Sequence, residues 1–280
     1  MMQLTSPRAV QSKVEPHQVP VGSTLNGPHW SNRIRSSRAF GRRDNRADLE
    51  ARGSAAATAT ASEPSVNLLV QEAVEVAAEV AYVSAKRLID LVGSLAVIAL
   101  LSPVMAVIAL LVKLYDGGPV LYRHTRVGHR GREFSCYKFR SMSPNADAVK
   151  LTIQELNDHD DHRTFKMKND PRVTPLGRLL RKASLDELPQ LWNIIAGDMS
   201  LVGPRPPVPA EVAAYSPADM ERLSVKPGLT CIWQVSGRSH IPFPEQLQMD
   251  LEYIENRSLL LDLKLIARTV PAVLSAHGAY

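Results

Sequence analysis

Apolar and polar positions follow different patterns in different parts of the chain. Residues 1–64 have few bulky apolar side chains and are rich in Ser, Arg, Pro, Gly and Ala. Such a segment cannot bury enough apolar surface to offset the entropy of folding, so we expect a disordered tail. From Val66 to Lys86 apolar residues recur at steps of three and four, with glutamates between them. This periodicity predicts an amphipathic helix over residues 65–87.

The longest apolar run follows directly. Leu91–Val112 contains 22 residues without a charge, enough to cross a bilayer as a straight helix. Pro103 lies in its middle, where the ring clashes with the carbonyl of Ala99, so a bend is expected that the Ser102 hydroxyl can help to satisfy. Basic residues flank both ends, as in a helix that enters and leaves by one face. The pattern alone leaves a spanning helix and a re-entrant helix over 88–115 equally open.

Downstream, the pattern alternates between short strands and helices. Val120–His124 and Glu133–Phe139 have strand character on either side of a glycine-containing turn. Helices are expected in four places: from about residue 145, at 176–182, from Leu185 to a stop at Gly197, and over Leu259–Leu274 with a break at Pro271. The last of these is apolar enough to lie on a membrane surface or to pack in a core. Residues 116–280 are therefore predicted to form a small mixed domain of the helix-rich α+β class.

Charge and cysteine content narrow the function. The chain has a formal charge of +5, but residues 1–65 hold nine Lys/Arg against five Asp/Glu, so the rest carries only +1. A nucleic-acid-binding domain would concentrate basic residues on its folded part, so that class is disfavoured. Cys136 and Cys231 are far apart and outside any C-x-x-C pattern, which argues against a disulfide framework or zinc site and suits a reducing compartment. The N-terminus also lacks the apolar core of a signal peptide.

The strongest local chemical signal is the segment Ser184–Glu187. It reads as a capping box, in which Ser184 and Glu187 only satisfy backbone groups at the start of a helix. Asp186 is not needed for that box, and the first helical turn together with nearby basic residues would keep it ionised beside a bound phosphate. Such a carboxylate can attack phosphorus and form an aspartyl-phosphate-type intermediate. The residues leave capping and catalysis evenly balanced.

Other segments are less specific on their own. Arg205 lies between two prolines that fix its backbone and aim the guanidinium, although a solvated turn would look the same. A short strand after Lys226 would leave Arg238 just past its end. The alternation at Lys138, Arg140 and Met142 predicts one shared strand face. The remaining pattern, Leu188, Leu191, Trp192 and Ile195, has the spacing of a core stripe.

A second acidic segment offers a competing chemistry. Asp158 and Asp160 form a D-x-D pattern with histidines beside it, as in a metal-dependent glycosyltransferase. The segment is polar and follows no buried strand, so a solvated loop is the preferred interpretation. Neither the common nucleotide-binding glycine motifs nor the G-x-S-x-G hydrolase motif occurs in the sequence.

In combination these segments resemble a known family. In chain order they are Lys86-Arg87-x-x-Asp90, Ser102-Pro103, Lys138–Met142, Leu176–Arg181, Ser184–Gln190, Gly203–Pro206 and Trp233–Arg238. Each is weak alone, but their order resembles the monotopic phosphoglycosyl transferases, bacterial sugar transferases that initiate exopolysaccharide or glycan assembly. The resemblance covers about residues 86–280. It is greatest to the short members that lack additional N-terminal membrane helices.

The resemblance implies an activity and a topology. A cytosolic catalytic domain with surface-lying amphipathic helices would be attached at the cytoplasmic face of the inner membrane by a re-entrant helix bent at Ser102 and Pro103. The enzyme would move a sugar 1-phosphate, from a UDP-hexose such as UDP-galactose or UDP-glucose, onto polyprenyl phosphate (undecaprenyl phosphate). It would be Mg²⁺-dependent, with Asp186 as nucleophile and metal ligand and Glu187 in support. The resemblance leaves open whether the enzyme forms a homo-oligomer.

The same resemblance assigns the basic residues and marks two departures. Substrate phosphates would be bound by five basic side chains: Lys138, Arg140, Arg181, Arg205 and Arg238. Cys231 replaces a usual glycine, and Arg257 stands where an aromatic residue is common. Two other functions remain to be tested: a glycosyltransferase that uses Asp158 and Asp160 and releases UDP, and a non-catalytic membrane scaffold of a polysaccharide assembly complex.

Overall fold

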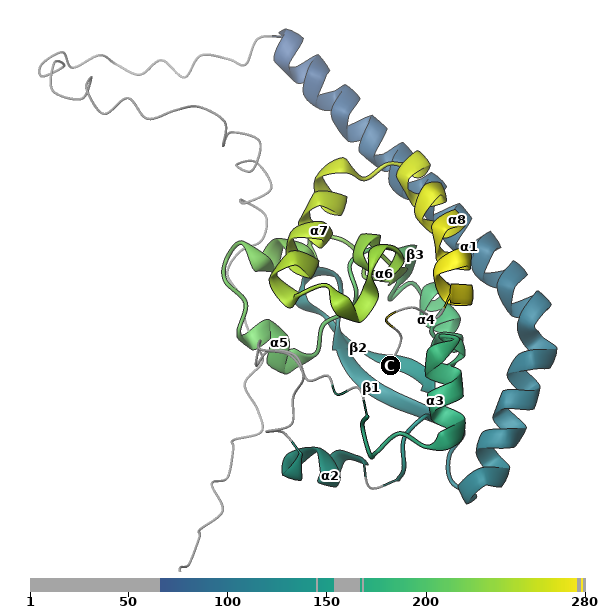
Figure 1. Cartoon of the computed structure of the whole chain (residues 1–280). Helices are drawn as coiled ribbons and strands as arrows, with labels where there is room; N and C mark the ends of the chain where they lie inside the picture. The colour runs from purple at the N-terminus through teal and green to yellow at the C-terminus, as the bar shows by residue number, and fades with distance from the viewer. Residues whose placement is uncertain (1–65, 145, 154–166, 168, 276–277, 279–280) are drawn as a thin grey trace, which may run out of the picture. The chain divides into compact units, whose positions relative to one another are not determined.

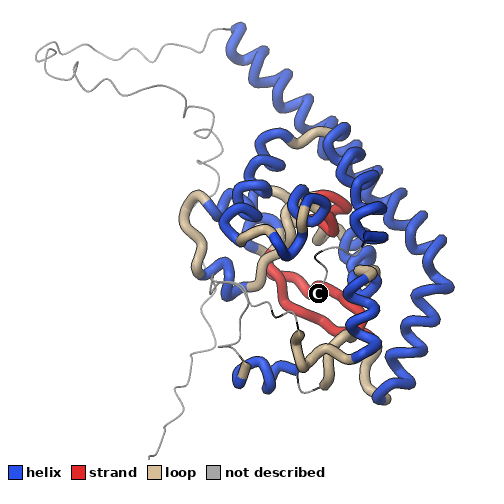
Figure 2. The backbone as a smooth tube through the Cα atoms, in the orientation of Figure 1, coloured by secondary structure: helices blue, strands red, loops and turns tan. Residues whose placement is uncertain are grey.

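The computed structural model describes residues 66–144, 146–153, 167, 169–275 and 278. They form a helix-rich α+β structure with two small sheets (Figures 1 and 2). The helices are α1 (Val66–Asp116), α2 (Ala146–Thr152), α3 (Pro175–Lys182), α4 (Gln190–Ala196), α5 (Pro209–Ala213), α6 (Ile232–Ser236), α7 (Phe243–Asn256) and α8 (Leu259–Ser275). The strands are β1 (Leu121–Val127), β2 (Glu133–Phe139), β3 (Ser200–Val202) and β4 (Gly228–Thr230). Short 3-10 turns are η2 (His129–Gly131), η4 (Leu185–Glu187), η5 (Asp219–Ser224) and η6 (Arg238–His240).

Helix α1 is continuous over 51 residues and includes both the amphipathic and the apolar segment expected from the sequence. It changes direction in its C-terminal half (Figure 1). Pro103 lies inside the helix, and the Ser102 hydroxyl donates a hydrogen bond to the Ala99 carbonyl at 3.0 Å. This is the carbonyl that a proline at position 103 deprives of its usual helical partner. The expected bend and its compensation are therefore both present.

Strands β1 and β2 form the antiparallel hairpin that the sequence predicts. Arg126 pairs with Phe134, and Tyr122 pairs with Lys138. The connection turns through Arg130 and Gly131, whose φ angles are +57° and +78°. Because alternate residues of paired strands share one face, Arg126 and Lys138 project from the same side of the hairpin.

Strands β3 and β4 pair in parallel, with Ser200 opposite Gly228. Gly203 and Gly228 let the two backbones approach closely, since a Cβ at Gly228 would lie 2.1 Å from the Gly203 nitrogen. A β-carbon cannot be accommodated there without a backbone shift. This close contact between the backbones of Gly203 and Gly228 fixes the position at which the Gly203–Pro206 segment begins.

The apolar core includes part of the membrane helix. Ile108 and Val112 of α1 pack with Phe139 and Leu180 in one buried cluster. Two further clusters are centred on Leu191, Ile194 and Met199, and on Val202, Tyr253 and Leu265. The C-terminal half of α1 is therefore a component of the core.

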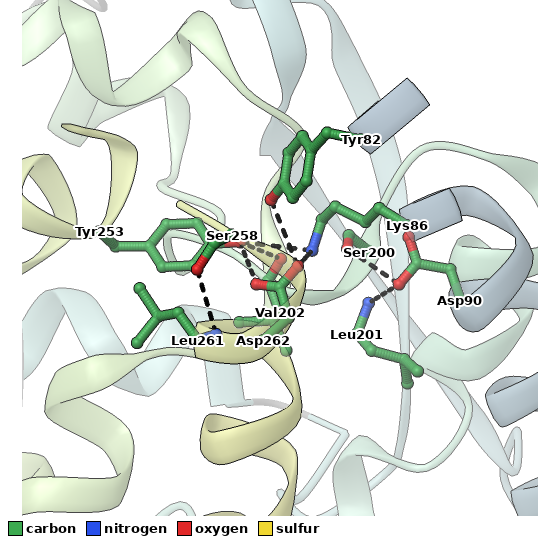
Figure 3. A network of polar contacts seen from close by, with 10 residues as sticks. All are labelled: Tyr82, Lys86, Asp90, Ser200, Leu201, Val202, Tyr253, Ser258, Leu261 and Asp262. Carbon is green, nitrogen blue, oxygen red and sulfur yellow. Dashed lines mark hydrogen bonds and ion pairs between the residues drawn. The ribbon is translucent and has the colours of Figure 1, made fainter. Parts of the chain in front are cut away.

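Polar contacts hold the first part of α1 to the domain (Figure 3). Asp262 of α8, which is almost fully buried, accepts from Lys86 Nζ at 2.8 Å and from the Tyr253 hydroxyl at 2.7 Å. One turn later, Asp90 accepts from the Ser200 hydroxyl at 3.0 Å and from the backbone of Leu201 at 2.9 Å. These contacts give Lys86 and Asp90 a structural role at the junction of α1, α8 and β3.

The rest of α1 exposes apolar side chains. It is the one helix in the described part of the chain that is long and apolar enough to cross a membrane. Large exposed side chains on it include Leu88, Val92, Leu95, Leu100, Val107, Leu110 and Leu114. A contiguous exposed apolar surface of this kind marks an interaction with membrane or protein. It supports membrane association.

Three expectations about secondary structure are wrong. Helix α8 continues through Pro271 to Ser275, because the proline falls near the end of the helix and interrupts only its last turns. Arg238 does not directly follow a strand, because the strand after Lys226 has only three residues and α6 lies between the two. Of the predicted core stripe, Leu191 is buried and Leu188 packs against the core, but Trp192 is 53% exposed and Ile194 is buried in its place.

Candidate active site

Glu187 is the centre of a group of charged side chains drawn from three parts of the chain. Its Oε1 lies 2.6 Å from Lys138 Nζ of β2 and 3.2 Å from Nη2 of Arg205, in the segment after β3. Burial alone would raise the pKa of the Glu187 carboxyl, but the two cations outweigh it and hold that pKa far below its usual range. Glu187 is therefore a permanent anion that orients Lys138 and Arg205.

These contacts rule out the capping box. Ser184 has a φ of +53°, in the left-handed region, and its side chain makes no capping hydrogen bond. The Glu187 carboxylate binds the two cations instead of the Ser184 backbone. A non-glycine residue in this region of φ is uncommon and costs energy, and such residues cluster at functional sites. The strained position turns the chain so that Asp186 and Glu187 face the cations.

Asp186 is adjacent in sequence but differs in environment. It is only 6% exposed, and among the described residues it has no ion-pair partner. Burial raises the pKa of its carboxyl; Lys138 lowers that pKa, and the negative charge of Glu187 raises it again. The sequence suggested that a helix N-terminus would keep Asp186 charged, but η4 is a single 3-10 turn and burial is the larger effect. Asp186 is thus a buried carboxyl group near Lys138, Arg181 and Arg205 that forms an ion pair with none of the described residues.

Arg205 is held as the sequence suggested, between Pro204 and Pro206, immediately after the close approach of Gly203 and Gly228. Its side chain is about one-third exposed. The charge of Glu187 raises the pKa of the guanidinium. Arg205 is thus a fixed cation with one side available to a ligand.

Two further arginines lie around this group. Arg181 of α3 donates from Nε to the Ser141 hydroxyl at 3.0 Å, and burial lowers its pKa while Asp186 raises it. Arg238 has a φ of +52° at the start of η6, and its Nη1 is buried without a partner among the described residues. Burial lowers the pKa of Arg238, and the charge of Glu187 acts against that change. Both arginines are close enough for the charge of Glu187 to raise their pKa.

The structure places the other predicted residues elsewhere. Arg140 pairs with Asp116 at the end of α1, since β2 ends at Phe139 and the expected shared face with Lys138 and Met142 does not continue. Ser102 and Pro103 lie at the bend of α1. The Asp158 and Asp160 segment is outside the described residues.

One residue was missed by the sequence reasoning. Arg126 of β1 lines a small pocket together with Cys136, Lys138, Gln190, Arg205 and Pro206. Its Nη1 donates to the Pro206 carbonyl at 2.9 Å. The signal was available, because the alternation of two paired strands puts Arg126 on the same hairpin face as Lys138.

In the part of the chain that the structure describes, side chains alone do not form a complete metal site. Within the described residues, no three His, Cys, Asp or Glu side chains come together as a ligand group. Mg²⁺ commonly takes one or two carboxylates and completes its shell with water and substrate phosphates. Asp186 fits that arrangement, whereas the Oε1 of Glu187 is already bound to Lys138 and Arg205.

The departures from the family pattern have local explanations. Arg257 pairs with Glu79 of α1, and its guanidinium lies 6.0 Å from the centre of the Tyr82 ring. Cys231 is fully buried and its thiol donates to the side-chain carbonyl of Gln234 at 3.1 Å. Neither substitution touches Asp186 or Glu187.

The chain is similar in sequence to several known bacterial proteins. The exopolysaccharide production protein ExoY of Rhizobium meliloti is 45% identical over 199 residues, which are 70% of this chain and 88% of that protein. The undecaprenyl-phosphate galactose phosphotransferase of Salmonella typhimurium is 44% identical over 201 residues, 70% of this chain and 41% of that protein. The UDP-glucose:undecaprenyl-phosphate glucose-1-phosphate transferase of Caulobacter vibrioides is 38% identical over 203 residues, 70% of this chain and 72% of that protein.

The family comparison covers most of the described structure. The bacterial sugar transferase family matches residues 81–276, which extend from shortly before Lys86 to the end of α8. This range contains the bend of α1, both sheets and every side chain of the charged group around Glu187. The chain belongs to the bacterial sugar transferase family.

Proposed function

We propose that this protein transfers a hexose 1-phosphate from a UDP-sugar to polyprenyl phosphate, as the first step in assembling an exopolysaccharide repeat unit. One observation carries the proposal: Asp186 is a buried carboxylate beside Lys138, Arg181 and Arg205, and no described residue forms an ion pair with it. Undecaprenyl phosphate is the acceptor in the names of two relatives, and galactose and glucose are the sugars named. A hexose donor is therefore the expectation.

The reaction has two displacements at one phosphorus atom. A carboxylate oxygen of Asp186 attacks the β-phosphorus of the UDP-sugar, and the bond from that phosphorus to the bridging oxygen breaks, releasing UMP. A phosphate oxygen of polyprenyl phosphate then attacks the same phosphorus. The bond to Asp186 breaks, which regenerates the carboxylate and gives polyprenyl diphosphate sugar. No proton has to be removed from either nucleophile when both are ionised.

The cations around Asp186 suit these steps. Phosphoryl transfer is catalysed mainly by positioning and by offsetting negative charge on the phosphate oxygens. Lys138 and Arg205 are held in place by Glu187, so they need little reorganisation when the substrate binds. Mg²⁺, bound jointly by Asp186 and the diphosphate, would supply further charge neutralisation.

Contacts of α1 support a re-entrant topology. Before the bend, Lys86 binds Asp262; after it, Val112 packs with Phe139 and Leu180 of the same domain. A spanning helix would separate these two ends by about 30 Å of hydrocarbon. One domain cannot contact both ends from opposite sides of a membrane. We infer that both ends lie at the cytoplasmic face of the inner membrane, where UDP-sugars are made.

Exposed apolar residues on other helices suit the same arrangement. Leu179 of α3, Trp192 of α4, and Leu260 and Leu263 of α8 are all more than half exposed. Tryptophan and leucine at the surface of a membrane-bound enzyme are typical of contact with the interfacial region. These helices would rest on the membrane beside α1 and bring the active site to the lipid phosphate.

The proposal is tested by product identity. Purified enzyme with Mg²⁺ and a panel of UDP-sugars should release UMP, in a stoichiometric burst before acceptor is added, and polyprenyl phosphate should then allow turnover. Asp186→Asn should abolish the burst. Release of UDP would contradict the proposal and favour a glycosyltransferase that uses Asp158 and Asp160. Absence of any nucleotide product would favour a scaffold.

A further inference from the structure

Arg126 combines an unusual position with incomplete hydrogen bonding. It comes from β1, on the hairpin face that also carries Lys138, and lines the pocket next to Arg205. Its Nη1 donates a hydrogen bond to the Pro206 carbonyl. Its Nε is buried, and no residue in the described part of the chain accepts a hydrogen bond from it. A buried guanidinium donor without an acceptor is costly and calls for an explanation.

The charge around Arg126 points in the same direction. Burial lowers the pKa of Arg126 and the charge of Arg205 lowers it further, whereas Glu211 and Glu187 raise it without reversing the direction. Glu187 acts electrostatically on five cations: Arg126, Lys138, Arg181, Arg205 and Arg238. Asp186 lies near three of them, and Glu211, the other carboxylate near Arg126, is already paired with Arg222. The unliganded site therefore has an excess of positive charge in a partly buried pocket. Repulsion of this kind is relieved when an anion binds.

The hydrogen bond to Pro206 also has a consequence. It fixes the Arg126 guanidinium against the segment that presents Arg205. The two arginines are thus held on the same pocket wall before any ligand arrives. Preorganised arginines in this arrangement bind phosphate oxygens through charge-assisted hydrogen bonds.

We propose that Arg126 is a phosphate-binding residue of the active site, which donates from its Nε to an oxygen of a bound phosphate. The ligand chemistry is a phosphate monoester or diphosphate, supplied either by the UDP-sugar or by polyprenyl phosphate. The inference rests on the proposed function only for the identity of these two ligands. Binding of UMP alone tests the nucleotide source without requiring turnover.

Two variants are compared. Arg126→Gln can still donate a hydrogen bond to the Pro206 carbonyl but has no positive charge. Arg126→Lys keeps the positive charge but lacks the planar set of guanidinium N–H donors. Arg123→Gln is the matched control, because Arg123 is exposed on the same strand and lies over the Tyr137 ring rather than in the pocket. Each full-length variant is purified in detergent. UMP affinity is measured by calorimetry, the UMP burst by rapid quench, and the KM for polyprenyl phosphate at saturating UDP-sugar.

If the nucleotide is the source, Arg126→Gln weakens UMP binding by about 10- to 100-fold, the range of a lost charge-assisted hydrogen bond. If the lipid phosphate is the source, UMP binding is unchanged and the KM for polyprenyl phosphate rises by a similar factor. In either case Arg126→Lys recovers part of the loss, and Arg123→Gln behaves as wild type.

A purely structural role gives a different result. Both Arg126 variants would then keep wild-type UMP affinity and acceptor KM, with only a lower kcat or melting temperature, and the proposal would be overturned. An Arg126→Gln variant that fails to fold leaves Arg126→Lys to decide by the same criteria. If wild-type enzyme binds UMP but releases none from any UDP-sugar, the proposed function fails while the UMP arm still tests Arg126.

Discussion

At the scale of single residues, Asp186 and Glu187 show how two neighbouring carboxylates acquire different roles. Lys138 and Arg205 neutralise Glu187, whereas burial and the adjacent Glu187 charge disfavour ionised Asp186. A nucleophile that is poorly stabilised in its charged form is more reactive than one held in ion pairs. The strained backbone at Ser184 belongs to the same arrangement.

Replacing Asp186 should separate activity from stability. The pKa of Asp186 is raised in the folded protein, so its ionised form opposes folding at neutral pH. Asp186→Asn removes that charge, and we expect the melting temperature to be equal or higher while the UMP burst falls about 10³-fold or more. Scanning fluorimetry and rapid quench measure the two effects.

Glu187→Gln is the matched comparison for Asp186→Asn. The pKa of Glu187 is lowered by folding, so its charge contributes stability that is present at neutral pH and is lost progressively as the pH falls below the ordinary pKa of a glutamate. Removing it leaves Lys138 and Arg205 without their shared anion, and the melting temperature should fall. A rise in melting temperature for Glu187→Gln would contradict the electrostatic account.

The burst rate should depend on pH through Asp186. Its carboxyl must be ionised to attack, and its pKa is raised, so the rate should decline at a higher pH than an ordinary aspartate would require. Lys138, Arg181 and Arg205 limit that rise, and Glu187 increases it. In Glu187→Gln the acidic limb should therefore move to lower pH. If the acidic limb of the pH profile does not move, the ionisation that controls the burst rate belongs to a group other than Asp186.

At the scale of elements, sequence patterns located the hairpin, α3 and the apolar helix, because each has local periodicity or turn residues. The sequence left the role of Ser184–Glu187 open between capping and catalysis, because the interactions that decide its geometry come from Lys138 and Arg205, which are distant in sequence. Arg126 was missed because the expected strand ended at His124, whereas β1 continues to Val127 and includes it. Burial of Asp186, which is also non-local, reversed the expected direction of its pKa.

The junction between α1 and α8 is testable at this scale. Asp262→Asn removes the anion that Lys86 and Tyr253 share in a nearly buried position, and breaking such a pair costs about 3 kcal/mol. The exposed pair of Glu79 and Arg257 links the same helix to the domain, and Glu79→Gln should cost less than about 1 kcal/mol. Denaturation of both variants in one detergent gives the comparison. Equal effects would mean that the Lys86 pair does not anchor the helix.

At the scale of the whole molecule, the bend of α1 decides on which side of the membrane each part lies. Glu72 precedes the apolar run and Arg178 follows it, and both are exposed. With a re-entrant helix, Glu72→Cys and Arg178→Cys should both react with a membrane-impermeant maleimide in inverted vesicles, and neither in intact spheroplasts. The native Cys136 and Cys231 are buried and give a low background. Labelling from opposite sides would establish a spanning helix.

The shared packing of Ile108 and Val112 with Phe139 and Leu180 also affects how the protein is made. Translation delivers α1 before the residues that cover it, so the helix reaches the bilayer while its inner face still lacks Phe139 and Leu180. The catalytic part in turn completes its core only against a helix that is already inserted. If α1 inserts as proposed, membrane insertion is a folding step of the enzyme. A fragment that begins after Asp116 would lack Ile108 and Val112, and we expect it not to form a soluble catalytic domain.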